Sequence, residues 1–303
     1  MAKYEDKVMA ASINQSQAKT DETAWNGSKE SRLMEYLLIT LGVLFVLVML
    51  VLPLMTVLVS SFQQGIAFYV KAVTTKYVLS ALGLTLGAAL VAVIVSSLFG
   101  LCAAYAIGKF DFKGKQLLMT LIDIPFSVSP VIAGLAFIMV FGRIGWGYGI
   151  IDTINQWLGT NWRVVFALPG VFLATIFVTL PFVFREVIAI MHTHGREEEE
   201  AAVLMGASGL TVFWKITFPQ IKWGFLYGVL LCSARALGEF GAVSALSKAR
   251  GSTFTLPLEI DALYLSATGD SITAAFAASS LLVFLSICLL IVRTYVEHRH
   301  SRG

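Results

Sequence analysis

Apolar residues occur along this chain in long continuous runs and not in alternation with polar residues. A helix needs about 20 apolar residues to cross roughly 30 Å of hydrocarbon, and its backbone can satisfy its own hydrogen bonds there. A membrane β-barrel would alternate polar and apolar residues, which runs such as VLFVLVMLVLPLM do not do. The pattern therefore predicts an all-α membrane protein with six transmembrane helices, over residues 36–59, 79–107, 117–141, 164–184, 223–247 and 272–292.

The composition agrees with this prediction. Of the 303 residues, 57% are apolar and only 14% are charged, whereas ordinary soluble domains carry about 25% charged residues. Residues 1–32 are polar and contain no apolar core of a signal peptide. We expect them to form a disordered cytoplasmic tail before a six-span membrane domain at 33–303. The three cysteines lie singly in apolar runs, which favours small buried side chains over a disulfide or metal role.

The distribution of positive charge predicts the orientation in the membrane. If six helices cross, one side receives 15 Lys and Arg residues and the other receives six, while Arg235 lies inside the fifth run. Loops rich in Lys and Arg stay in the cytoplasm. This places both termini and the connection at 185–222 in the cytoplasm, and the stretch GRIGWGYG outside.

The connection at 185–222 contains its own helix signals. Glu197 to Glu200 begin a helix-forming run, where negative charge favours the positive end of the helix dipole, and Gly206 is suited to the end of that helix. A short helix with small and apolar residues outside the membrane needs a surface on which to dock. We expect it to occupy a groove on a soluble partner.

The same connection resembles the EAA loop of ABC importer permeases. The resemblance is carried by the spacing of Glu200-Ala201-Ala202, Gly206, Ile216 and Phe218-Pro219, with Phe218 in place of the family's leucine. The segments LIDIPFSVSPVIAGLAF and CSARALGEFGAVS are similar to sulfate and molybdate permeases. From about residue 36 the chain resembles the CysW-type subunits of sulfate/thiosulfate importers in the bacterial inner membrane.

This resemblance implies a type I importer fold and a set of partners. Two similar permease subunits would sit on two ATPase subunits, which bind ATP and Mg, and a periplasmic sulfate-binding protein would deliver the anion. The EAA helix would couple the ATPase to the membrane helices: Glu200 would contact the ATPase, and Ala201, Ala202 and Gly206 would permit close approach. Pro219 would set the turn back toward the membrane.

A charge inside the bilayer costs roughly 2.5–3.5 kcal/mol, so Arg235 and Glu239 need an explanation. They are four residues apart, close enough to pair on one helix face. One interpretation is a structural pair that fixes helix packing. In the other, Arg235 attracts an oxyanion along the transport path and Glu239 restrains it, so that Arg235→Leu abolishes uptake and leaves assembly intact.

The third run contains two prolines that interrupt the helical hydrogen-bond ladder, Pro125 and Pro130. We expect a kink there, with hydroxyls of Ser127 and Ser129 bonding freed backbone groups or an anion in the path. Two glycine pairs, Gly83/Gly87 and Gly224/Gly228, predict close helix packing.

The chain has no G-x-x-x-x-G-K-[ST] motif, so we expect no enzymatic activity of its own and ATP hydrolysis by a partner. His192 and His194 have no further ligands nearby, so no metal site is predicted, and nothing in the small net charge of +3 indicates nucleic acid binding. Two alternatives remain: a molybdate or tungstate importer, whose substrates are also tetrahedral dianions, and a secondary transporter driven by an ion gradient.

Overall fold

The computed structural model describes residues 29–195 and 197–300, which form helices and connecting turns without a strand among them. The chain divides into two units, residues 1–57 and 58–303. Most of the predicted tail, residues 1–28, lies outside the described residues. The first helix, α2, begins at Lys29, slightly before the expected end of that tail.

The first unit contains α2 (Lys29–Val46), the π-helix η1 (Leu47–Val51) and the start of α3 (Leu52–Ser61). Its described side chains from Met34 to Thr56 are all exposed, although the segment is the most apolar of the chain. A wide π turn directly before Pro53 has a physical reason. Proline clashes with the carbonyl of the residue four positions earlier and donates no hydrogen bond, and a π turn accommodates both defects.

The second unit carries the remaining helices. In chain order they are α4 (Ile66–Val73), α5 (Lys76–Lys109), α6 (Lys115–Ser127), α7 (Pro130–Phe141), α8 (Trp146–Leu158), α9 (Leu168–His194), α10 (Glu197–Leu204), α11 (Gly209–Val212), η2 (Phe213–Thr217, a π-helix), α12 (Phe218–Leu237), α13 (Gly241–Leu246), α14 (Leu256–Leu265) and α15 (Gly269–His300).

The core of this unit forms where α5 and α12 pack on α9. A Cβ at Gly100 of α5 would lie 2.8 Å from the backbone nitrogen of Phe184, and one at Gly228 of α12 would lie 2.9 Å from Cα of Val183. Glycine is therefore required on both sides of α9 for the backbones to approach this closely. The pair Gly224/Gly228 packs as predicted, whereas nothing lies within 4 Å of a Cβ at Gly83 or Gly87.

Of the six predicted spans, the described residues contain four helices long and apolar enough to cross a membrane, or five if α6 and α7 count as one bent span. Three of the four contain the predicted runs at 36–59, 79–107 and 272–292. The fourth, α9, begins at Leu168 within the predicted run at 164–184 and continues to His194. The run at 117–141 bends by 109° between its two helices, far more than a simple kink. The run at 223–247 is interrupted after Leu237. Its helix, α12, is not among the candidates, because Lys222 and Arg235 lower its mean hydropathy.

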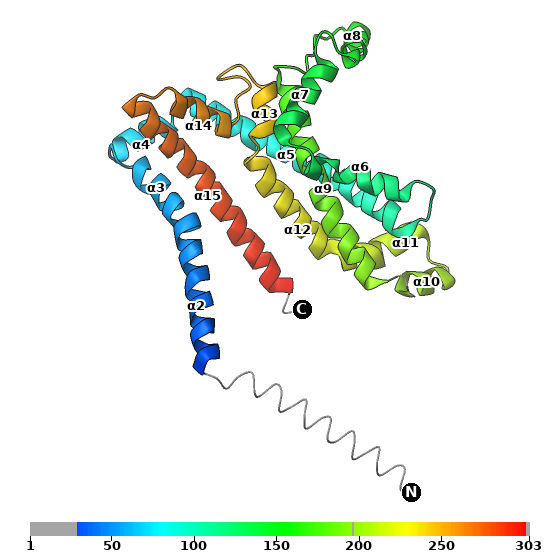
Figure 1. Ribbon diagram of the computed structural model, residues 1–303. Helices are drawn as coiled ribbons and strands as arrows, with labels where there is room; N and C mark the ends of the chain where they lie inside the picture. Colours follow the sequence, from blue (N-terminus) through cyan, green and yellow to red (C-terminus); the bar gives the residue numbers. More distant parts are fainter. Residues whose placement is uncertain (1–28, 196, 301–303) are drawn as a thin grey trace. The chain divides into compact units, whose positions relative to one another are not determined.

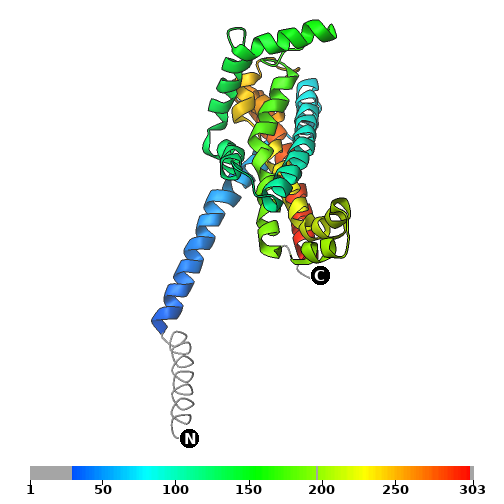
Figure 2. The ribbon, with the colours of Figure 1, turned by 90° about the vertical axis from the view of Figure 1, so that its right-hand side faces the viewer.

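The long helix α9 connects two ends of the second unit. Its 27 residues rise about 40 Å at 1.5 Å per residue, enough to span a bilayer. In both ribbon views α8 lies at one end of α9, and α10 and α11 lie at the other (Figures 1 and 2). The unit therefore carries two distinct sets of short helices at opposite ends.

Candidate functional site

The EAA segment forms a helix with a well-defined end. α10 begins at Glu197 with four glutamates in its first turn, as the sequence predicts. At its other end, the N–H of Ala207 donates to the carbonyl of Ala202 (3.0 Å) and that of Gly206 donates to Val203 (2.9 Å). This is a Schellman motif, and Gly206 adopts the positive φ of 87° that it requires.

The four glutamates divide into two groups. Glu199 forms an ion pair with Lys109 at the end of α5 and accepts a hydrogen bond from the Thr217 hydroxyl at 2.6 Å. Glu198 accepts one from Gln220 at 2.8 Å. Glu197 and Glu200 are exposed and bond no other side chain among the described residues. Two glutamates therefore hold α10 against its own chain, and Glu197 and Glu200 remain exposed.

The other predicted coupling residues lie near Glu200 with different exposures. Ala202 is buried, whereas Ala201 and Gly206 are exposed. Pro219 does not form the turn implied by the family resemblance, because α11, η2 and α12 follow one another without interruption. The π turn again precedes a proline, for the reason given for Pro53. The reversal of the chain lies instead between α10 and α11, at Gly206.

This segment also exposes large apolar side chains. Leu204 and Met205 are 88% and 82% exposed, and Leu210 is 75% exposed. Exposed apolar side chains on a short helix whose first turn carries exposed acidic groups are typical of a protein-binding surface. We call residues 197–220 the coupling segment.

The second candidate region lies where two interrupted helices meet. The break between α6 and α7 falls at Val128–Ser129, and the break between α12 and α13 falls at residues 238–240. A Cβ on Gly241 would lie 3.0 Å from Cβ of Pro130, and one on Gly134 would lie 2.5 Å from the carbonyl oxygen of Ala242. The two breaks are thus packed together. At membrane depth, interrupted backbone is tolerated where protein buries it or where it lines a cavity.

Arg235 and Glu239 do pair, as predicted, but not along one helix. Arg235 is in the last turn of α12 and Glu239 follows its end, with Nη2 and Oε2 2.8 Å apart. This contact lacks hydrogen-bond geometry. The other oxygen, Oε1, accepts a bond from the Ala242 N–H at 2.8 Å and so caps α13. The side chain of Glu239 is only 1% exposed and that of Arg235 is 32% exposed.

A second ion pair at the broken helices was not predicted. Arg185 of α9 donates from Nε to Oδ1 of Asp123 in α6 at 2.8 Å. Its guanidinium also lies 4.4 Å from the ring centroid of Phe126. The side chains of Arg185 and Asp123 are 52% and 38% exposed. The sequence placed Arg185 in the connection after the fourth span, but α9 continues to His194.

The two serines lie at the break as predicted, without the predicted bonds. Ser127 ends α6 and Ser129 is the N-cap residue of α7. Both are exposed, and neither hydroxyl forms a hydrogen bond with the described residues. Ser129 gives no side-chain cap to α7. Both hydroxyls are therefore available to a solute or a neighbouring subunit.

Another ion pair that the sequence did not predict lies where α14 packs on the start of α5. Arg250 donates from Nε to both oxygens of Glu259 at 3.0 Å, and its guanidinium lies 4.9 Å from the Tyr77 ring. Hydrogen bonding to Glu259 raises the pKa of Arg250 above its ordinary value. Glu259 is fully buried, so this pair ties α14 to the start of α5. The described residues contain no group of three or more His, Cys, Asp or Glu side chains arranged to hold a metal ion.

The family with the description "Binding-protein-dependent transport system inner membrane component" matches residues 96–302, more than half of the sequence. The chain belongs to this family. The chain is also 40% identical over 269 residues to the sulfate transport system permease protein CysW of Synechocystis sp., across 88% of this chain and 94% of that protein. The CysW protein of Escherichia coli is 40% identical over 267 residues, 88% of each chain. The resemblance to CysW-type permeases is thus confirmed.

The fold agrees with this assignment. The crystal structure of a bacterial alginate ABC transporter in complex with an alginate pentasaccharide-bound periplasmic protein contains a similar chain, with a TM-score of 0.72 and 19% identity. The match covers 92% of this chain and 97% of that one. At this identity the likeness shows the fold alone. The protein is therefore a multi-pass membrane protein with the fold of an ABC transporter permease.

Proposed function

We propose that this chain is a permease subunit of an ATP-driven importer for sulfate or thiosulfate in a bacterial inner membrane. The observation that carries the proposal is its similarity to CysW proteins over nearly nine-tenths of its length. As in a type I importer, it would form the transport path with a second, homologous permease subunit. A periplasmic sulfate-binding protein would deliver the anion.

The coupling segment would dock on a cytoplasmic ATPase subunit. Two such subunits would bind ATP and Mg²⁺ and supply the hydrolysis. Glu200 supports this role because it is exposed and unbonded at the start of α10, beside the exposed Leu204 and Met205. Glu199 would transmit movement of α10 to the membrane helices, since it contacts both Lys109 of α5 and Thr217 before α12.

The anion path would run along the broken helices. Charged groups that persist at membrane depth usually face a water-filled cavity or another helix, and Arg185 and Asp123 are both half-open. The free hydroxyls of Ser127 and Ser129 lie at the same break. Arg185 would supply positive potential for the dianion, and Arg235 would contribute through its exposed part.

The orientation follows from the coupling role. If α10 meets a cytoplasmic ATPase, the other end of α9 and α8 face the periplasm, and six crossings place both termini in the cytoplasm. α12 would be the fifth crossing. α12 would tolerate Lys222 and Arg235 because α5, α9 and α15 pack against it. These helices would shield it from the lipid.

Reconstitution tests this proposal directly. The complete transporter in proteoliposomes, supplied with binding protein and internal ATP, should take up labelled sulfate in a vanadate-sensitive manner. Unlabelled thiosulfate should compete more effectively than molybdate. Preferential competition by molybdate or tungstate would favour that substrate class. Isolation of this chain as an active exchanger, without an ATPase or second permease, would contradict the importer itself.

A further inference from the structure

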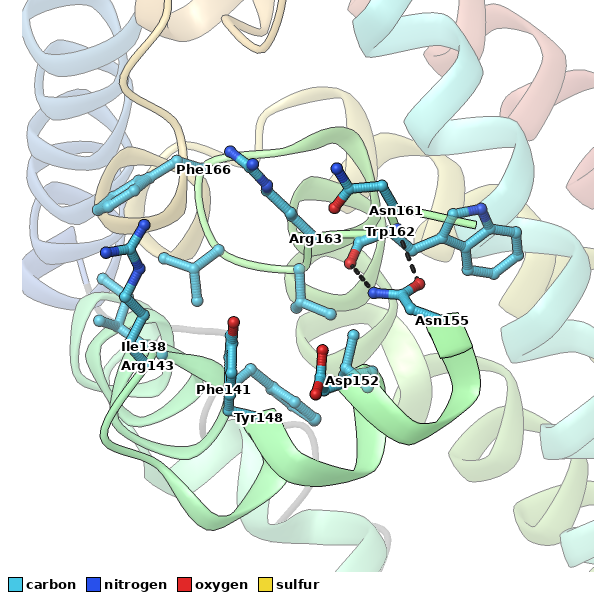
Figure 3. Close-up of a pocket in the computed structure, with 14 residues that line it drawn as sticks. Ile138, Phe141, Arg143, Tyr148, Asp152, Asn155, Asn161, Trp162, Arg163 and Phe166 are labelled. Carbon is cyan, nitrogen blue, oxygen red and sulfur yellow. Dashed lines mark hydrogen bonds between the residues drawn. The ribbon is translucent and has the colours of Figure 1, made fainter. Parts of the chain in front are cut away.

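An arginine-lined cavity lies at the end of α9 opposite the coupling segment. It has a volume of about 470 Å³, is open on one side and is lined by the end of α7, one face of α8 and residues 161–166. Figure 3 shows Arg143, Arg163 and Tyr148 around this space. Arg143 belongs to the glycine-rich stretch GRIGWGYG, to which no role has yet been assigned.

The cavity is preformed by its own chain. A Cβ on Gly145 would clash with the carbonyl oxygen of Val140, so glycine is required for the chain to fold back from α7 into α8. Across the cavity, the Asn155 amide donates to the Trp162 carbonyl at 2.9 Å and accepts from its N–H at 2.8 Å (Figure 3). Phe166 adopts a φ of 58°, a strained conformation for a bulky residue that often marks a binding site.

The lining is positively charged and unsatisfied. Arg143 and Arg163 are exposed, and neither has an ion-pair or hydrogen-bond partner among the described residues. Asp152 also lines the cavity, but its carboxylate accepts a hydrogen bond from Gln156 at 3.0 Å. Two guanidinium groups beside apolar walls favour a carboxylate, which arginine binds in a two-pronged geometry.

The volume decides between a free ion and a larger ligand. Because each water occupies about 30 Å³ in the liquid, the cavity holds roughly fifteen waters. A five-atom sulfate would leave most of this space filled by solvent and most of the apolar wall uncovered. A protruding protein loop can fill the space and cover the apolar wall, and an acidic side chain on it can reach the arginines.

We infer that this cavity receives an acidic loop of the periplasmic binding protein, with a carboxylate held between Arg143 and Arg163. The inference rests on the proposed function, which places this end of α9 outside the cytoplasm. It assigns the glycine-rich stretch a purpose: to build a rigid receptacle that presents two free arginines. Exposed charges of this kind mainly accelerate and orient the encounter between two proteins.

The test measures ATP hydrolysis by the complete transporter in proteoliposomes as the concentration of sulfate-loaded binding protein is varied. For Arg143→Gln/Arg163→Gln we expect the half-saturating concentration to rise at least about fivefold, with the rate recovered at high binding-protein concentration. Arg143→Lys/Arg163→Lys should restore only part of the affinity, because lysine keeps the charge without the two-pronged contact. The matched control is Lys71→Gln/Lys76→Gln, which removes the same charge from exposed positions outside the cavity and should not shift the curve.

An unchanged half-saturating concentration in the double arginine variant would overturn the inference. An equal shift in the lysine control would also overturn it, because net charge alone would then be responsible. A lower rate of ATP hydrolysis at saturating binding protein, with an unchanged half-saturating concentration, would identify a small-anion site instead. If sulfate-loaded binding protein fails to stimulate the unmodified transporter, the proposed function itself fails, which is a separate result.

Discussion

Two ion pairs beside the broken helices differ mainly in how exposed their side chains are. Arg235 and Glu239 are four residues apart, and the glutamate is 1% exposed. Arg185 and Asp123 come from different helices, and their side chains are 52% and 38% exposed. Both are salt bridges with an N–O distance of 2.8 Å. Their distances therefore do not distinguish a structural role from a transport role.

Burial makes this distinction. Glu239 accepts a bond from the backbone of α13 in addition to its contact with Arg235, so that side chain holds two helix ends together. Asp123 has Arg185 as its only hydrogen-bond partner in the described part of the chain, and both can be reached from outside. The comparison suggests that the first pair holds the broken helices in place and that the second pair meets the anion.

The largest effect is expected at the buried pair. Arg235→Leu would leave the Glu239 carboxylate buried without a cation, which costs about 3–5 kcal/mol. We therefore expect less assembled transporter in size-exclusion chromatography and a lower melting temperature in detergent. The transport interpretation, in contrast, expects assembly to survive the substitution. Normal assembly of Arg235→Leu would contradict the structural role.

A double variant separates structure from transport at the same position. In Arg235→Leu/Glu239→Gln, no charge is left unpaired and the amide oxygen can still cap α13. Assembly should recover, because replacing a buried pair by neutral groups is often neutral in stability. Sulfate uptake by this assembled variant identifies the pair as structural, whereas assembly without uptake places Arg235 in the path.

The next largest effect is expected at Arg185. Arg185→Gln removes a positive charge from a half-exposed side chain, so it should cost at most about 1 kcal/mol of stability. Sulfate uptake in proteoliposomes should fall about tenfold, equivalent to about 1.4 kcal/mol. Arg185→Lys keeps the charge and should retain most of the uptake. Full uptake by Arg185→Gln would remove Arg185 from the path.

A smaller effect of the opposite sign is expected at Asp123. Asp123→Asn removes the carboxylate that neutralises Arg185, so the arginine presents its full charge to an anion. Sulfate added without binding protein should protect a cysteine introduced at Ser127 from alkylation. The sulfate concentration needed for this protection should fall about two- to threefold in Asp123→Asn. Ser127→Cys alone provides the reference. Weaker protection in the Asp123→Asn background would show that Asp123 itself orders the site.

The two pairs also show what the sequence could predict. The pair of Arg235 and Glu239 could be predicted from their spacing of four residues, because helix geometry places such residues together. Arg185 and Asp123 are separated by 62 positions and meet only because α6 packs on α9. Apolar runs located the helices, and two prolines located the break in the third. The size of its bend depends on the packing of α7 against α13, which no local pattern contains.

A pair away from the broken helices completes the comparison with the smallest expected effect. Lys115 at the start of α6 lies 3.0 Å from Asp111 in the preceding turn, and their side chains are 27% and 83% exposed. Surface pairs contribute about 0–1 kcal/mol and are screened by salt. Lys115→Gln should therefore change the melting temperature and sulfate uptake by less than the scatter between preparations. If it lowered uptake as much as Arg185→Gln, the loss in both variants would reflect net charge, and exposure would no longer explain the difference between the pairs.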